Sequence, residues 1–189
     1  MARTTPASEA HLFPGWSWAA VALAFPIAGL LGRAAGGRVD EVGAALIGGI
    51  VTGAALGGAQ WFGARGALGP PGAWIAASAV GYGVGLPAGA ALVGYGTSVG
   101  DLAAMGAVSG VALGATQGLV LAAQARKRLA IAWAAAMPAL LAIGWSSTTL
   151  IGVSVEDQFT VFGALGAIVF TLLSGLVLAR YTPARPRPA

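Results

Sequence analysis

Residues 49–60 read Gly-Ile-Val-Thr-Gly-Ala-Ala-Leu-Gly-Gly-Ala-Gln, and a similar stretch, Gly-Ala-Val-Ser-Gly-Val-Ala-Leu-Gly-Ala-Thr-Gln, follows 57 residues later at 106–117. A second shift of 57 residues falls on 163–174, a weaker copy that keeps small side chains at corresponding positions. Each copy is apolar and carries small residues at every fourth position, which is typical of membrane helices that pack closely together. The sequence therefore predicts an all-α membrane protein built from a repeated helical hairpin.

The composition indicates insertion in a membrane. Hydrophobic residues make up 57% of the 189 residues and charged residues only 8%, whereas charged residues are roughly a quarter of a soluble domain. The mean hydropathy is +0.81. Six charge-free intervals of 22 residues or more can each cross the hydrocarbon core, which takes about 20 helical residues. Because these intervals are apolar on all sides, the alternating pattern of a transmembrane β-barrel is excluded.

These intervals predict six transmembrane helices in one domain, residues 15–181, between a polar tail at 1–14 and a Pro/Arg-rich tail at 182–189. The expected helices are residues 15–33, 42–64, 72–94, 102–125, 129–152 and 160–180. Pro26, Pro87 and Pro138 fall one in each odd-numbered helix and are expected to kink it. A cleaved signal peptide is the alternative for the first helix, but the repeat favours its retention, because three hairpins need six helices.

Basic residues are unequally divided between the two ends of the predicted helices. Eight of the ten fall on the side that carries both termini, and Arg33 and Arg38 fall on the other. The positive-inside bias therefore places both termini in the cytoplasm, in an inner or plasma membrane. Five tryptophans fall at the inner helix ends, where we expect their rings in the headgroup layer: Trp16, Trp18, Trp61, Trp74 and Trp133.

Five of the six acidic residues fall at the outer ends, just before even-numbered helices. They are Asp40, Glu41, Asp101, Glu156 and Asp157. There a carboxylate can cap a helix N-terminus and interact favourably with the helix dipole. The alternative is an acidic ring that gathers cations at the mouth of a pore.

Glycines at four-residue spacing form the clearest candidate contact surfaces. They lie on one helix face and let a neighbouring backbone approach closely, either inside the bundle or from another copy of the chain. The expected helix-packing positions are Gly49, Gly53, Gly57, Gly81, Gly85, Gly89, Gly106, Gly110, Gly114 and Gly118. A glycine-lined pathway, or the approach of a flat ligand such as a quinone or pigment, is the alternative.

Two glutamines, Gln60 and Gln117, occupy equivalent repeat positions toward the inner halves of their helices. A buried carboxamide costs free energy unless it is hydrogen-bonded, so each is expected to have a partner. The predicted role is an interhelical hydrogen bond. The alternative is a polar contact to a substrate.

One serine lies in a pattern that resembles an enzyme motif. Ala107-Val108-Ser109-Gly110 is similar to the Gly-x-Ser-Gly nucleophile motif of rhomboid intramembrane proteases, which are six-helix bundles. That chemistry needs a histidine on a later helix to activate the serine. The only histidine of this chain is His11, in the N-terminal tail. The sequence therefore argues against protease activity.

The residue inventory leaves little basis for catalysis. The chain has no cysteine, and no ionisable residue falls inside an expected span, so it lacks thiolate ligands and charged groups at membrane depth. No cofactor is expected, and the scattered basic residues do not indicate nucleic-acid binding. We expect a non-enzymatic structural or accessory component of a membrane complex, in contact with lipid and with a membrane-protein partner or a second copy. The alternative is a transporter or pore for a neutral or apolar small molecule.

Overall fold

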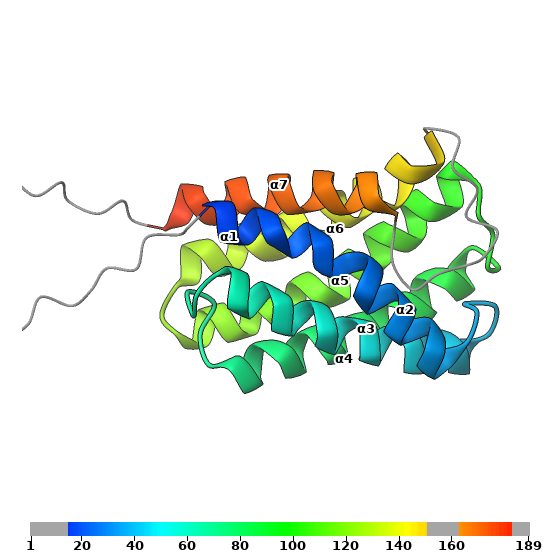
Figure 1. Ribbon diagram of the computed structural model, residues 1–189, viewed down its shortest axis with the longest axis horizontal. Helices are drawn as coiled ribbons and strands as arrows, with labels where there is room; N and C mark the ends of the chain where they lie inside the picture. Colours follow the sequence, from blue (N-terminus) through cyan, green and yellow to red (C-terminus); the bar gives the residue numbers. More distant parts are fainter. Residues whose placement is uncertain (1–14, 151–162, 183–189) are drawn as a thin grey trace, which may run out of the picture.

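The computed structural model describes residues 15–150 and 163–182, and every regular element in these ranges is helical (Figure 1). Within them, six spans are long and apolar enough to cross a membrane, as the charge-free intervals predict. The first span combines α1 (Gly15–Ala19), the 3₁₀ helix η1 (Ala20–Leu23) and α2 (Ala24–Gly36). The others are α3 (Val42–Gly63), α4 (Pro71–Leu92), α5 (Val99–Ala123), α6 (Lys127–Leu150) and α7 (Ala164–Tyr181).

The helix ends agree with the sequence prediction to within three residues wherever the described ranges cover them. The expected end of the fifth span at 152 and the expected start of the sixth at 160 lie outside the described residues. Charges and loop residues therefore mark the ends of the spans well, because burying them in hydrocarbon is costly.

The first span is not one continuous α-helix, and Pro26 explains why. A proline has no amide N–H, and its ring clashes with the carbonyl four residues earlier, here that of Ala22. Residues 20–23 wind as a 3₁₀ helix before α2 resumes. The expected irregularity is thus present at Pro26, whereas α4 and α6 continue as α-helices through Pro87 and Pro138.

The six spans form a closed ring in chain order. Among the described helices, each span contacts the one before it and the one after it, and α7 closes the ring against α1, η1 and α2. Helix α1 begins and α7 ends at the same end of the bundle, which we call the terminal end (Figure 1). The ring therefore has a single interior to which every span can contribute side chains.

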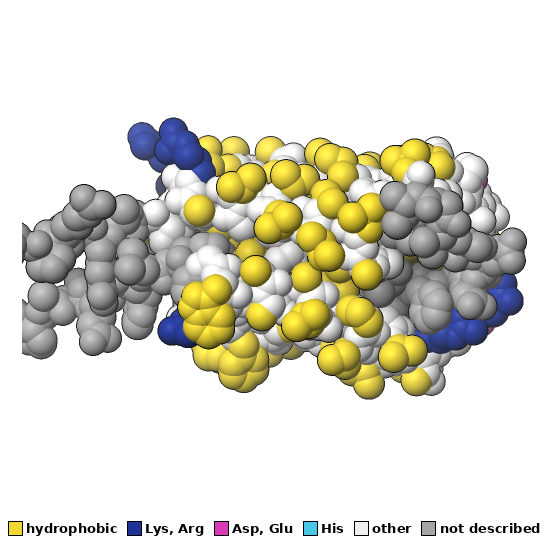
Figure 2. All heavy atoms as spheres, turned by 45° about the horizontal axis from the view of Figure 1, so that its top comes forward, with side chains coloured by type: hydrophobic (Ala, Val, Ile, Leu, Met, Phe, Trp, Pro, Cys, Tyr) yellow, Lys and Arg dark blue, Asp and Glu magenta, His cyan; other side chains and the backbone are white. Residues whose placement is uncertain are grey.

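The outer surface of the ring is apolar. Large hydrophobic side chains are exposed on every span, among them Leu30, Ile50, Val84, Leu119, Ile131 and Leu176. Figure 2 shows hydrophobic side chains along the sides of the molecule and Lys and Arg toward its two ends. The described basic residues at the terminal end lie between helices or in their end turns, and they are Arg65, Arg126, Lys127, Arg128 and Arg180. This distribution suits a protein surrounded by lipid.

Helix α5 begins with a capping box in which Asp101 takes part. The Ser98 hydroxyl oxygen accepts a hydrogen bond from the Asp101 amide at 3.2 Å, and the Asp101 carboxylate accepts one from the Ser98 amide at 3.1 Å. Two N–H groups that the helix leaves without partners are thereby satisfied. Capping is thus the role of Asp101, with Ser98 as the N-cap residue.

The other described acidic residues do not cap a helix. Glu41 occupies the N-cap position of α3, but its side chain makes no capping hydrogen bond, so this part of the capping prediction is wrong. Asp40 lies 4.0 Å from Arg38 in an ion pair whose two side chains are both more than half exposed. Glu156 and Asp157 lie outside the described residues.

Candidate functional site

The glycines of α3 face α4 at backbone distance. A Cβ atom placed on Gly49 would lie 2.8 Å from the carbonyl oxygen of Tyr82, and one on Gly57 would lie 2.7 Å from the Ser78 hydroxyl. A Cβ on Gly53 would overlap the Ser78 carbonyl. At Gly49 and Gly53 the backbones of α3 and α4 therefore touch without intervening side chains, and at Gly57 the space is filled by the Ser78 side chain.

The glycines at four-residue spacing on α4 and α5 continue this arrangement around the ring. We call each such row of glycines on one helix a glycine stripe. Gly81, Gly85 and Gly89 of α4 face α5, and Gly106, Gly110 and Gly114 of α5 face α6, with backbone atoms 2.5 to 3.0 Å from a Cβ at each position. Gly118 is looser, since its nearest neighbour, the Ala130 carbonyl, would lie at 3.3 Å. All of these contacts are within one chain, so the stripes are occupied by neighbouring helices of the same bundle.

Three tryptophans meet inside the ring near its terminal end. Trp18, Trp74 and Trp133 are only 2%, 0% and 0% exposed. The Trp133 ring makes edge contacts with those of Trp18 and Trp74, at centroid distances of 6.4 and 5.9 Å. Because α6 is not a ring neighbour of α1 or α4, these contacts cross the interior.

This burial corrects the expectation that these rings lie in the headgroup layer. Of the five tryptophans expected there, only Trp16 is largely exposed, and Trp61 is partly buried with its indole donating to the Gly69 carbonyl. The indoles of Trp18, Trp74 and Trp133 have hydrogen-bond acceptors inside the bundle, which offsets the cost of taking their N–H groups away from water.

Each of these three indoles donates a hydrogen bond to a neighbouring span. Trp74 Nε1 donates to Gln60 Oε1 at 3.2 Å, and Trp133 Nε1 donates to Gln117 Oε1 at 2.8 Å. Trp18 Nε1 donates to the Thr171 carbonyl at 2.9 Å. The indoles thus connect α4 to α3, α6 to α5 and α1 to α7.

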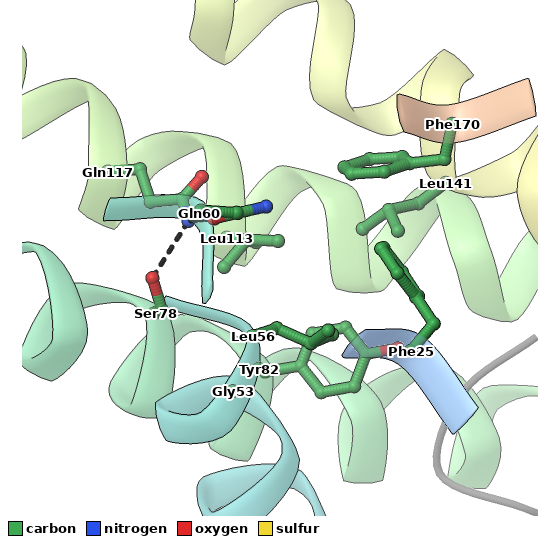
Figure 3. Close-up of a pocket in the computed structure, with 10 residues that line it drawn as sticks. All are labelled: Phe25, Gly53, Leu56, Gln60, Ser78, Tyr82, Leu113, Gln117, Leu141 and Phe170. Atoms are coloured by element: carbon green, nitrogen blue, oxygen red, sulfur yellow. Dashed lines mark hydrogen bonds between the residues drawn. The ribbon is translucent and has the colours of Figure 1, made fainter. Parts of the chain in front are cut away.

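The two glutamines are joined directly. Gln60 is 3% and Gln117 1% exposed. Gln117 Nε2 donates to Gln60 Oε1 at 3.2 Å. It also donates to the Ser78 hydroxyl at 2.9 Å (Figure 3). The Ser78 hydroxyl in turn donates to the Trp74 carbonyl at 2.8 Å. Sequence reasoning singled out both amides but missed Ser78, and it assigned the tryptophans to the headgroup layer instead of this network. The spacing of Trp18, Trp74 and Trp133, 56 and 59 residues, is close to the 57-residue period and is the signal that could have found them.

Next to this network lies a small cavity to which every span contributes. Its lining is Phe25, Gly53, Leu56, Gln60, Ser78, Tyr82, Leu113, Gln117, Leu141 and Phe170 (Figure 3). The space open to the centre of a water-sized molecule is only about 10 Å³. Phe25 and Phe170, which both line it, pack edge to face with centroids 5.7 Å apart. The interior beside the amides is therefore closely packed in the described part of the ring.

Loops at the terminal end are tied together by side chains. The Arg126 guanidinium donates to the Ala67 carbonyl, and Gln124 Nε2 donates to the Leu68 carbonyl at 3.1 Å. Partial burial lowers the pKa of Arg126 from its ordinary value, because desolvation disfavours the charged form. The Arg65 guanidinium lies over the Trp16 ring, 4.9 Å from its centroid.

The interior holds hydroxyl and amide groups but, within the described residues, no cluster of three or more metal-ligating side chains. Ser109 is fully buried, and its hydroxyl has no hydrogen-bond partner in the described part of the chain. The arrangement can therefore bind hydrogen-bonding groups, and its described residues supply no base beside the serine. Comparison with family models, curated proteins and solved structures finds no match to this chain.

Proposed function

We propose that the chain is a non-enzymatic structural or accessory component of a membrane complex. The observation that carries this proposal is that the interior of the ring is filled by its own side chains, with about 10 Å³ left beside the amides. A protein with a filled interior acts on other molecules through its surface. The surface between its two ends is the apolar face of exposed Leu, Ile and Val side chains.

The positions of the glycine stripes limit the surfaces at which a partner can bind. Each one faces a helix of the same chain, so a partner or second copy would have to bind elsewhere. The exposed sides of the spans carry larger side chains, for example Leu23 of η1, Leu119 of α5 and Leu176 of α7. Binding there would be by side-chain packing between apolar surfaces within the bilayer.

The three-hairpin repeat and the orientation belong to the same proposal. Leu56, Leu113 and Phe170 line one cavity at positions 57 residues apart, and the bonded pair Gln60 and Gln117 has the same separation, which supports a repeat around a common axis. With eight basic residues on the side of the termini, we place both termini in the cytoplasm and the protein in an inner or plasma membrane.

Site-specific photo-crosslinking in native membranes tests the proposal. A photoreactive amino acid is placed singly at Leu23, Leu119 and Leu176, which are exposed on different parts of the ring. A complex with a fixed partner or a second copy should give one discrete adduct from one of these faces, and the adduct should co-purify in mild detergent at constant stoichiometry. Adducts from no face, or diffuse adducts from all three, would contradict a fixed partner.

A transporter or pore for a neutral or apolar small molecule is the second candidate. It is favoured by the buried polar groups without partners that line the interior, such as the Tyr82 hydroxyl. Such a protein needs a second conformation, since the cavity beside the amides has no room for a solute larger than water. Solute flux into liposomes containing the purified chain, above the flux of protein-free liposomes, would favour this candidate over the first.

A further inference from the structure

The two indoles determine the direction of the hydrogen-bonded network. An indole N–H can only donate, so Trp133 requires the oxygen end of Gln117, and Trp74 requires the oxygen end of Gln60. The amide nitrogen of Gln117, Nε2, then faces away from Trp133. Its two N–H groups are both used, in the bonds to Gln60 Oε1 and Ser78 Oγ. If either side-chain amide were flipped, its N–H group would face the indole N–H, and no hydrogen bond could form between them.

With the amides oriented in this way, the amide nitrogen of Gln60 is the last group of the network. The side-chain hydrogen bonds of Gln60 are both made by Oε1, so its Nε2 has no acceptor among the described residues. Figure 3 shows this nitrogen turned away from Ser78, on the side where Leu113 lies. Gln60 is only 3% exposed, and a side-chain N–H group without an acceptor there is unfavourable, so an acceptor that the described residues do not supply would stabilise the fold.

A second unused donor lies on the same cavity. The Tyr82 hydroxyl has no hydrogen-bond partner within the described residues, and the side chain beside it, Trp145, offers an indole N–H, which cannot accept its proton. Gln60 and Tyr82 both line the cavity, and no charged side chain does. The lining therefore has donors in excess, and it selects a neutral molecule that accepts hydrogen bonds.

The size of the cavity decides which acceptor fits. About 10 Å³ is open to the centre of a water-sized molecule, and one water needs roughly 10–15 Å³ by this measure. We propose that the centre of the ring binds a single water molecule, which accepts a hydrogen bond from Gln60 Nε2. This site is independent of the partner proposed above, because it is enclosed by the helices that form the interior.

A high-resolution structure of the full chain in a lipid environment tests the proposal directly. We expect one isolated density peak about 2.7–3.2 Å from Gln60 Nε2. The matched variants are Gln60→Met, which keeps the length of the side chain but has no N–H, and Ser109→Ala, which removes a buried hydroxyl outside the cavity lining. The peak should disappear in Gln60→Met and remain in Ser109→Ala.

Each other outcome overturns the proposal. No peak in the wild-type protein means that the amine stays unpaired, and a peak that persists in Gln60→Met means that Gln60 does not hold the water. Elongated density in place of a single peak means that a lipid chain or larger solute occupies the centre. The wild-type result alone decides the first and third cases, so the test does not depend on the variant being folded.

Discussion

Replacing Gly110 by alanine tests the close approach of α5 and α6 in the ring. The added Cβ would lie 2.5 Å from the Met137 carbonyl oxygen and 2.5 Å from the Pro138 Cα, both of which are backbone atoms of α6. Ordinary contact begins at 3.4 Å, so α5 and α6 would have to separate by about 0.9 Å, the difference between these two distances. No side-chain rotation can relieve the overlap.

The expected cost follows from this displacement. Overpacking a tightly packed interior typically costs about 1–3 kcal/mol, and the higher helix propensity of alanine returns up to about 1 kcal/mol. A net loss of about 1–2 kcal/mol lowers the melting temperature of a chain of this size by about 2–8 °C. The measurement is a thermal melt of the purified variant in one detergent, followed by size-exclusion chromatography.

The chain supplies a matched control on the same helix. At Gly118 the added Cβ would lie 3.3 Å from the Ala130 carbonyl, so the helices need to move by only about 0.1 Å to reach the 3.4 Å contact distance. Gly118→Ala should therefore melt at or slightly above the wild-type temperature. If Gly110→Ala melts no lower than Gly118→Ala, close backbone contact does not govern stability, and the packing argument fails.

Three further predictions concern the amides, a helix cap and the orientation. Because Gln60 and Gln117 are hydrogen-bonded to each other, Gln→Leu changes at the two sites should be strongly non-additive, with a coupling of about 0.5–3 kcal/mol in a double-mutant cycle of thermal melts; additive losses would exclude the direct bond. Ser98→Ala should lower the free energy of unfolding by about 0.5–2 kcal/mol through loss of the α5 cap, and an unchanged melt would show that the cap is dispensable. Reporter fusions after Arg65 and Arg128 should both report the cytoplasm, and an outside signal from either would overturn the proposed orientation.

The sequence predicts the spans well and the interior only in part. Burying a charge in lipid is so costly that residues such as Arg65 and Asp101 lie within three residues of the ends of the spans. The polarity of Gln60 and Gln117 likewise marks them out in an apolar stretch. Their actual partners depend on which helices are neighbours, which periodicity along one chain does not specify.

The misplaced tryptophans show the same limit. An indole near a helix end is compatible with the headgroup layer or with the interior, and the choice depends on the direction in which that residue faces. Trp74 and Trp133 face inward because amide oxygens are present there to accept their N–H groups. The N-cap residue of α5 was likewise not predicted. It is Ser98, because the N-cap position depends on where the backbone of α5 becomes helical.

The closure of α7 against the first span has a consequence for biogenesis. Trp18 and Thr171, which are hydrogen-bonded across this seam, are separated by 153 positions in the chain. During synthesis the first helix enters the membrane before the last one has been made. The Trp18 indole therefore lacks its native acceptor while the four spans between them are inserted. The seam is therefore the last junction that a nascent chain can complete.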